Sequence, residues 1–408
     1  MAADPRLPRL NALLARVGAD VPFQRERGRG RPLADLAELR DLPPVTPAEL
    51  AADQAAHPPW GTNLGAPPEA YVQLHQTSGT TGRVLRVPDT AADGRWWARR
   101  FAAVFAAAGV KASDRVALAW SFGPHVQFWA SHAGVLELGA LAIPLGGMDS
   151  PARLRTLRDH EATVLACTPS YAAHLARVAA ANDLDDALAT VRLVVCGGEP
   201  GGSLPAVREA IEAAWGARCV DHAGSTEAGS YAVPCAEHGG LHLAEDDLVC
   251  ELLTPGADDP APEGELGELV VTALDRVGFP AVRLRTGDVV RRRDAPCPSG
   301  HVGRWVPEGI LGRADDMVVI RGMNVFPSAL EQLLREVEPD GEFRITFYTD
   351  PRAMDEVKLE AELAHPSDAR VVQDRMRQRL GLRVRIVPLK PGVLPRQTGK
   401  ARRVRDLR

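Results

Sequence analysis

The sequence has little of what marks a secreted, membrane or disulfide-stabilised protein. Its 408 residues include six cysteines, too few for a disulfide-rich scaffold. No run of about 20 residues is free of polar side chains, as a membrane-spanning helix requires. The first 20 residues lack the uninterrupted apolar core of a signal peptide. We therefore expect a cytoplasmic protein that does not use a membrane.

Positive charge is also outnumbered, and lysine is almost missing. The chain carries 48 basic and 53 acidic residues, a net charge of −5, which does not favour nucleic acid as a partner. Lysine occurs at four positions, so each one can be weighed separately: Lys111, Lys358, Lys390 and Lys400.

The order of apolar runs predicts an α/β protein with a large N-terminal and a small C-terminal part. Between residues 115 and 196, short apolar runs alternate with helical segments such as 128–141, the pattern of a mostly parallel sheet. Residues 248–293 predict a β-rich subdomain, because strand-like runs are separated there by Gly, Pro and Asp turns. The remaining residues read as a small α+β unit, so we expect domains at 1–312 and 313–408.

A glycine- and hydroxyl-rich segment at residues 77–83 could bind phosphate. Its glycines allow close backbone approach, and hydroxyl and N–H groups can donate to phosphate oxygens. The spacing is not that of a Walker P-loop, and a polar hairpin turn is the simpler alternative. The segment consists of Thr77, Ser78, Gly79, Thr80, Thr81, Gly82 and Arg83.

Three later segments carry carboxylates or a lysine in turns. In 221–227, Glu227 follows a Gly-Ser-Thr turn and could hold Mg²⁺, although a capped helix N-terminus explains the turn equally well. Asp288, in 285–288, could grip a ribose diol through two hydrogen bonds. Lys400 follows Gly399 and could face a phosphate or carboxylate, or simply belong to a solvated basic tail.

Taken in order, these segments resemble the motifs of the adenylate-forming acyl-coenzyme A synthetase superfamily, above all its phenylacetate-coenzyme A ligase branch. TSGTTGR at 77–83 resembles the phosphate loop and GGEP at 197–200 the loop beside the substrate. DHAGSTE at 221–227 resembles the magnesium motif and RTGD at 285–288 the ribose motif. Residues 312–327 resemble the inter-domain hinge, and PRQTGK at 395–400 the catalytic-lysine loop. The resemblance covers essentially the whole chain.

The resemblance implies a two-step reaction. A carboxylic acid reacts with MgATP to form an acyl-adenylate and pyrophosphate, and coenzyme A thiolate then displaces AMP after the C-terminal domain rotates. It implies that Lys400 bridges the carboxylate and the α-phosphate and that Glu227 holds Mg²⁺. Asp315 would be the hinge, and Gly322 would let the backbone pass close to pantetheine.

The resemblance also assigns a nucleotide site in the N-terminal domain, which would then be the AMP-binding domain. Arg83 stands where the family usually has lysine and keeps the positive charge. The residues assigned to the nucleotide are Thr77, Ser78, Gly79, Thr80, Thr81, Gly82, Arg83, Gly198, Glu199, Asp221, His222, Thr226, Asp288 and Arg313.

An aromatic acid is the expected substrate, either an aryl or an arylacetic acid. Phe122 and His125 belong to an aromatic-rich segment that could form one wall of the acid pocket, although such segments are often plain core. Gly198 and Ala223 are small and leave room for a ring. Ala223 replaces a tyrosine that packs on adenine in many members of the superfamily.

A structural zinc site is a further expectation, because some members of the branch carry a Cys/His cluster of this kind. Cys235, His242, Cys297 and His301 could form a Cys₂His₂ tetrahedron, with His238 as a substitute ligand. An ordinary thiol with solvent-facing histidines is the alternative. The four other cysteines lie in apolar, strand-like contexts and are expected in the core.

Other acceptors and other functions remain open at this point. A carrier-protein phosphopantetheine or an amine could replace coenzyme A, and the chain could form a homodimer. A non-catalytic nucleotide-binding relative is disfavoured by Lys400, Glu227 and Asp288, since a sensor needs no catalytic lysine.

Overall fold

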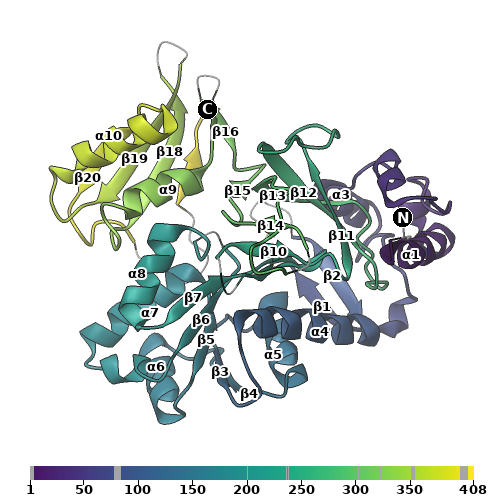
Figure 1. Cartoon of the computed structure of the whole chain (residues 1–408), viewed down its shortest axis with the longest axis horizontal. Coiled ribbons are helices and arrows are strands. Elements are labelled where there is room, and N and C mark those ends of the chain that lie inside the picture. Colours follow the sequence, from purple (N-terminus) through teal and green to yellow (C-terminus); the bar gives the residue numbers. More distant parts are fainter. Residues whose placement is uncertain are drawn as a thin grey trace.

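A computed structural model describes most of the chain and confirms the α/β class (Figure 1). The structure describes residues 4–77, 84–199, 201–235, 237, 239–301, 303–320, 323–350, 354–395 and 403–408. A large part built on several sheets carries a smaller α+β part, drawn in yellow-green, against one end of its central sheet. No helix among these residues is long and apolar enough to cross a membrane.

The N-terminal segment packs helices onto the β-rich region. Helix α1 (Arg6–Asp20) buries Leu10, Leu13, Leu14 and Val17, which recur at helical spacing. Helix α3 (Pro47–Ala56) begins with a capping box between Thr46 and Glu49. The other short elements here are α2 (Pro22–Arg25), η1 (Leu36–Asp41) and η2 (Pro68–Ala70).

Two antiparallel strands flank the predicted phosphate loop in the sequence. Strand β1 (Tyr71–Gln76) precedes residues 77–83, and strand β2 (Arg86–Thr90) follows them and pairs with β1. Helix α4 (Ala91–Ala108) follows at once, with Thr90 and Asp93 forming a second capping box.

A five-stranded parallel sheet forms the centre of the large part, in the order β4-β3-β5-β6-β7. Two of its three inner strands, β5 and β6, are buried at every residue, as apolar runs covered on both faces should be. The strands are β3 (Arg115–Leu118), β4 (Leu141–Pro144), β5 (Val164–Cys167), β6 (Leu193–Cys196) and β7 (Arg218–Asp221). The segments between them form α5 (Val126–Glu137), α6 (Ser150–Asp159), α7 (Pro169–Ala181), η3 (Asp185–Leu188) and α8 (Pro205–Trp215).

Alternate residues of these strands enter two different cores. Val116, Leu118 and Val164 face the cluster that contains α4 and α5, whereas Ala117 and Leu165 face the cluster under α6, α7 and α8. The predicted helix 128–141 begins and ends earlier, as α5. It stops at Glu137 because Gly139 adopts a left-handed conformation, φ 79°.

The β-rich region is larger than the sequence predicts, because its first strands are short and contain Gly and Ser. Sheet β14-β10-β9-β8 begins at Ala223, so residues 223–225 are a strand and the helix N-terminus considered for this motif is wrong. Its members are β8 (Ala223–Ser225), β9 (Gly229–Pro234), β10 (Leu241–Leu243) and β14 (Trp305–Val306). The second sheet, β11-β12-β13-β15, contains β11 (Leu248–Leu253), β12 (Leu266–Ala273), β13 (Leu284–Arg291) and β15 (Gly312–Arg313).

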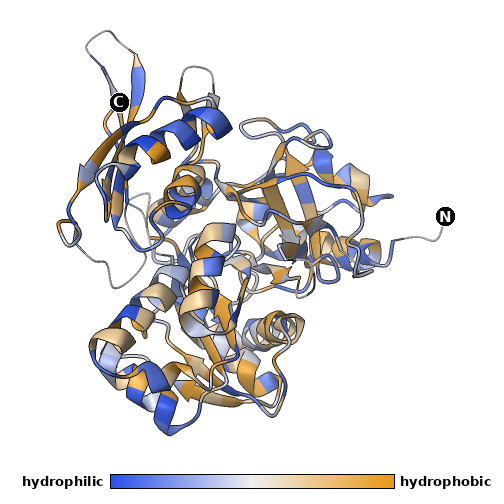
Figure 2. Ribbon diagram, turned by 60° about the vertical axis from the view of Figure 1, so that its left-hand side comes forward, coloured by the Kyte–Doolittle hydropathy of each residue, from blue (hydrophilic) through white to orange (hydrophobic). Residues whose placement is uncertain are grey.

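The C-terminal part has its own core and touches the large part through α8. In Figure 2 its strands carry both hydrophobic and hydrophilic residues, and its outer helix surface is mostly hydrophilic, while the hydrophobic residues of strands and helices form a core of their own. Gln332 of α9 accepts a hydrogen bond from the Ala206 N–H at the start of α8, 3.3 Å. The elements are β16 (Val318–Ile320), β17 (Met323–Val325), α9 (Pro327–Arg335), β18 (Phe343–Thr349), β19 (Asp355–Glu362), α10 (Asp368–Leu380), β20 (Arg385–Leu389) and β21 (Val404–Asp406).

The contact between α4 and α5 allows a direct test of this packing. Gly134 of α5 lies against α4, and a Cβ there would sit 2.4 Å from the Phe101 Cβ and 2.8 Å from the Ala102 nitrogen. We expect Gly134→Ala to destabilise the protein by about 1–3 kcal/mol, because backbone must move to admit the methyl group. Gly94→Ala, in α4 with open space around it, should instead stabilise by about 0.4–1 kcal/mol. Denaturant unfolding of both variants checks this, and equal effects would contradict it.

Candidate active site

The carboxyl ends of the parallel strands bring two of the predicted motifs together. Strand β6 ends at Cys196 and continues into the 197–200 loop, while β7 ends at Asp221, directly opposite Cys196. Ligands of open parallel sheets bind at this edge, because the loops that leave it converge there. The structure therefore places the loops of Gly198, Asp221 and His222 side by side.

His222 is buried and held at both ring nitrogens. Its Nδ1 lies 2.7 Å from the Cys196 carbonyl oxygen, and its Nε2 lies 3.0 Å from the Gln127 amide nitrogen. Burial lowers the pKa of His222 to about 4, so the ring is neutral at pH 7, donates through Nδ1 and accepts at Nε2. A Cβ at position 197 would lie 2.2 Å from the His222 Cε1, so the loop needs Gly197 there.

Asp221 is a buried carboxyl group that titrates near neutrality. The Ser203 hydroxyl donates to its Oδ2 at 2.8 Å and the His222 N–H donates to its Oδ1 at 3.0 Å. Burial nevertheless raises the pKa of Asp221 to about 7. Asp221 and Ser203 also line a cavity of about 720 Å³ that lies between α8 and α9.

The ribose motif and the start of the hinge motif pair as neighbouring strands. Asp288 of β13 stands opposite Arg313 of β15, with 3.6 Å between their charged groups, and Arg313 also binds Asp315 in a fork at 2.8 and 3.1 Å. Gly287 has φ 79°, and a Cβ there would lie 2.5 Å from the Arg313 Nη2. The absence of a side chain at Gly287 therefore leaves room for the Arg313 guanidinium.

Tyr231 belongs to this group, although no sequence motif points to it. Its hydroxyl donates to Asp288 Oδ2 at 2.5 Å. Burial, followed by the charge of Asp288, raises the pKa of Tyr231, so the hydroxyl remains a donor. A buried tyrosine in a short strand has no motif spacing that could have revealed this contact.

The two acidic residues of the loop motifs are both fixed. Glu227 is buried, and its carbonyl oxygen, like that of Thr226, accepts a hydrogen bond from Arg276 at 2.7 Å. Glu199 accepts from the Ser170 N–H at 2.8 Å, which ties the 197–200 loop to the first turn of α7. Arg276 is a second residue that the sequence reading missed.

Several predicted residues lie outside the part of the chain that the structure describes. Thr77 is described, and it forms hydrogen bonds with the Leu85 backbone through its N–H and its Oγ1, both 3.0 Å, at the base of the loop. The residues outside are Ser78, Gly79, Thr80, Thr81, Gly82, Arg83, His238, Gly322 and Lys400.

The predicted pocket residues fall into an exposed and a buried group. Phe122 is 60% exposed and packs on Phe128 and Trp129 with ring centroids 4.9 Å apart, while His125 is exposed and lies 3.3 Å from the Gln76 carbonyl. Ala223 is buried, at the start of β8. Gly198 has φ 83°, and a Cβ there would find space, with Thr168 and Trp120 about 4 Å away, at 3.8 and 4.0 Å.

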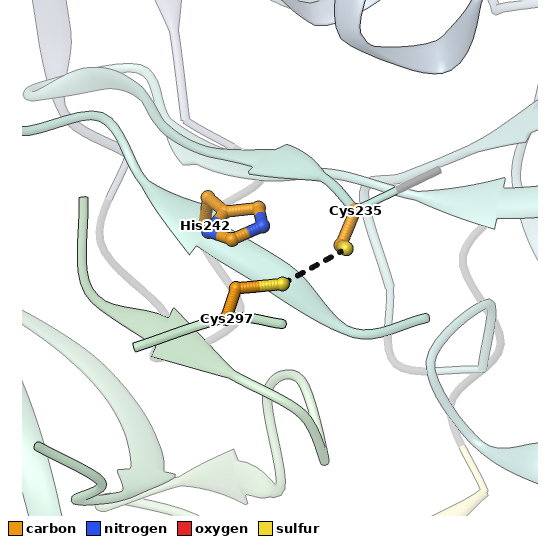
Figure 3. A group of neighbouring side chains, drawn as sticks. All are labelled: Cys235, His242 and Cys297. Atoms are coloured by element: carbon orange, nitrogen blue, oxygen red, sulfur yellow. Dashed lines mark hydrogen bonds between the residues drawn. The ribbon is translucent and has the colours of Figure 1, made fainter. Parts of the chain in front are cut away.

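The predicted zinc ligands gather where β9, β10 and the 297–301 turn meet (Figure 3). The sulfur atoms of Cys235 and Cys297 are 3.7 Å apart, and the donor atoms of Cys235, His242 and Cys297 lie within 4.8 Å of one another. The His301 ring is 4.1 Å from the His242 ring. His242 is 1% exposed, so a solvent-facing histidine is wrong there, and neither of its ring nitrogens has a partner among the described residues.

Comparison with known proteins finds relatives that match nearly the whole chain. Residues 322–408 match the model of the AMP-binding enzyme C-terminal domain. The chain is 31% identical to phenylacetate-coenzyme A ligase of Thermus thermophilus, over 98% of this chain and 95% of that protein. It is 30% identical to the Pseudomonas putida protein of the same name, over 99% and 93%.

A solved structure of 2-hydroxyisobutyryl-CoA ligase in the postadenylation state, with 2-HIB-AMP, superposes with TM-score 0.91 at 30% identity, covering 98% of this chain and 88% of that one. The same enzyme in the thioesterification state gives 0.73. This chain belongs to the adenylate-forming acyl-coenzyme A synthetase superfamily, in its phenylacetate-coenzyme A ligase branch. It is an AMP-forming acid-coenzyme A ligase, as the order of its motifs predicts.

The raised pKa of Asp221 predicts a pH-dependent stability difference. The folded state holds this proton up to about pH 7, whereas the unfolded chain releases it near 3.8, so the contribution of Asp221 to stability falls as pH rises toward 7. Asp221→Asn removes that dependence. The stability of the variant relative to the natural protein should rise between pH 5 and 7, by at most about 1.4 kcal/mol per pH unit. Thermal unfolding across this range checks it, and a constant difference would refute it.

Proposed function

We propose that this ligase activates an aromatic carboxylic acid with ATP and Mg²⁺ and transfers the acyl group to coenzyme A. The observation that carries the proposal is the pairing of Asp288 with Arg313 beside the loops of Asp221 and Glu227. Asp288 and Arg313 would bind the ribose hydroxyls, and the 720 Å³ cavity beside Asp221 is large enough for a small-molecule ligand. Gly198, Glu199, His222 and Thr226 would complete the nucleotide site.

The first reaction step brings two anions together, and cations must offset their repulsion. In our proposal Glu227 holds Mg²⁺, which takes carboxylate oxygens, and the 77–83 loop cradles the β- and γ-phosphates. Lys400 bridges the acid's carboxylate and the α-phosphate. Its ammonium would stabilise the negative charge that develops around the α-phosphate as the carboxylate attacks it and pyrophosphate leaves.

An aromatic acid fits the neighbourhood of the 197–200 loop. Phe122, Phe128 and Trp129 form one aromatic group at the entrance to α5, and Phe122 presents much of its ring to solvent. Gly198 and Ala223 are small and would leave room for a ring. We propose Phe122 and His125 as the pocket's outer wall, with His125 available to a polar substituent on the ring.

We further propose that the C-terminal part, 313–408, turns about Asp315 between the two half-reactions, with Gly322 then facing pantetheine. The arrangement of the two parts is closer to a relative's postadenylation state than to its thioesterification state, which supports two positions for one domain. Arg313 forks onto Asp315, so a ribose contact and the hinge adjoin.

Acid-dependent pyrophosphate release tests the proposed function. Across phenylacetate, substituted benzoates, cinnamates, 2-hydroxyisobutyrate and fatty acids, we expect the aromatic acids to give the highest kcat/KM. Lys400→Ala should reduce that rate by about 10²–10³, the usual cost of losing a preorganised donor. It should leave thioester formation from a supplied acyl-adenylate unchanged, because domain rotation has carried Lys400 away.

Two controls make this outcome decisive. Lys390→Ala changes a lysine outside the motif and should retain both half-reactions. Equal loss of both steps in Lys400→Ala would assign Lys400 to the fold or to coenzyme A. Replacing coenzyme A by hydroxylamine separates an acyl-coenzyme A product from transfer to an amine or a carrier protein.

We propose a structural Zn²⁺ at Cys235, His242, Cys297 and His301. Two close sulfurs and a buried imidazole without a partner suit a tetrahedral Cys₂His₂ site. The ion would join β9, β10 and the 297–301 turn, and it takes no part in the reaction. The ligands lie outside the nucleotide motifs.

Metal analysis of the purified, dialysed protein should find about one zinc per chain. Cys297→Ser should lose the metal and lower the melting temperature, because three segments lose their common ligand. Cys250→Ser, at a buried cysteine away from this cluster, should keep the zinc. A natural protein without zinc, with the same melting temperature in the presence of a chelator, would eliminate the site.

A further inference from the structure

One fully buried guanidinium grips the backbone of the magnesium motif. Arg276, between β12 and β13, is 0% exposed. Its Nη1 donates to the carbonyl oxygens of Thr226 and Glu227, each at 2.7 Å, and its Nη2 donates to Asp89 Oδ1 at 2.7 Å. The guanidinium therefore connects the peptide of Glu227 to strand β2.

The carboxylate of Asp89, which Arg276 contacts, is also buried, and both of its oxygens accept a hydrogen bond. Asp89 is 1% exposed and also accepts from the Trp97 indole nitrogen at 2.9 Å. The His75 Nε2 lies 3.3 Å from its Oδ2. Burial lowers the pKa of His75, so the ring beside Asp89 is neutral at pH 7. His75 lies on β1 only two residues before Thr77, where the phosphate loop begins.

The turn that contains Arg276 is also held by hydrogen bonds to the first turn of α4, which directly follows β2. Asp93, in the first turn of α4, accepts from the N–H groups of Val277 and Gly278 at 3.3 and 3.2 Å. A Cβ at Gly278 would lie 2.0 Å from Asp93 Oδ2, so only glycine allows this approach. The Arg276 guanidinium also lies 5.1 Å from the Trp97 ring centroid.

We propose that Arg276 is a positioning residue that fixes Glu227 relative to strand β2 and to the end of β1 beside Thr77, through Asp89 and His75. The inference rests on the proposed function, in which Glu227 binds Mg²⁺. Mg²⁺ demands near-ideal geometry, so a displaced carboxylate weakens its binding. Lysine cannot replace Arg276, because a single ammonium cannot reproduce a planar fork that reaches two carbonyls and a carboxylate from separate nitrogens.

The test measures acid-dependent pyrophosphate release against free Mg²⁺ concentration for Arg276→Lys. We expect the half-saturating Mg²⁺ concentration to rise about tenfold or more, the usual effect of removing an outer partner of a metal ligand. Thioester formation from a supplied acyl-adenylate should keep its rate, since that step proceeds after pyrophosphate has left.

Arg283→Lys is the matched control. Arg283 is also buried, at 1% exposed, is paired with Glu251 at 2.8 Å, and donates to the carbonyls of Arg40 and Leu42. None of these groups belongs to a predicted motif. Arg283→Lys should therefore lower the melting temperature without changing the Mg²⁺ requirement.

Glu227→Gln distinguishes the role of Glu227 in binding Mg²⁺ from the role of Arg276 in positioning it. If this variant raises the Mg²⁺ requirement and Arg276→Lys does not, the positioning inference is overturned and the role of Glu227 stands. If Glu227→Gln leaves the requirement unchanged, the role of Glu227 fails, and the inference fails with it. If Arg276→Lys does not fold, Trp97→Phe provides the test, because it removes one hydrogen-bond donor to Asp89 and keeps an aromatic side chain at this position. A natural Mg²⁺ requirement in that variant would overturn the inference.

Discussion

A parallel sheet whose inner strands are buried on both faces can meet a polar ligand only at the ends of those strands. Helices must cover both faces, and each crossover returns the chain to the same edge, so the loops after β6 and β7 converge. Asp221, His222 and the 197–200 loop lie there because of this constraint. The antiparallel sheets then bring Asp288 and Arg313 to the same region, although 25 residues separate them in sequence.

Polar groups beside this edge are buried together with their partners. His222 is neutral and lies between a carbonyl and an amide group. The Asp89 carboxylate is contacted by the Arg276 guanidinium, the Trp97 indole N–H and the His75 ring. An unpartnered charge in such surroundings would cost far more than these paired ones. Their hydrogen bonds fix the loops, and fixed donors are what an enzyme needs where charge develops during reaction.

The hydrophobic core of the C-terminal part is not continuous with the core of the large part. The C-terminal part has a separate core, so it can move as a unit without exposing the core of the large part. Its described contacts with α8 include the hydrogen bond between Gln332 and Ala206. A separate core is what the proposed rotation of this part requires.

The sequence by itself determined the α/β class, the order of the motifs and the elements with strong local signals. The strand Phe343–Thr349 and the helix Asp368–Leu380 belong to the C-terminal part that the sequence predicts as a small α+β unit, because periodicity there is complete within one segment. The short strands β8 and β10 escaped prediction, since three residues are too few to show a periodicity. Tyr231, Arg276 and Asp89 escaped as well. Their roles depend on contacts such as Tyr231–Asp288 and Arg276–Asp89, between residues 57 and 187 positions apart, and only the tertiary structure, which buries these side chains beside the motifs, decided which partners they meet.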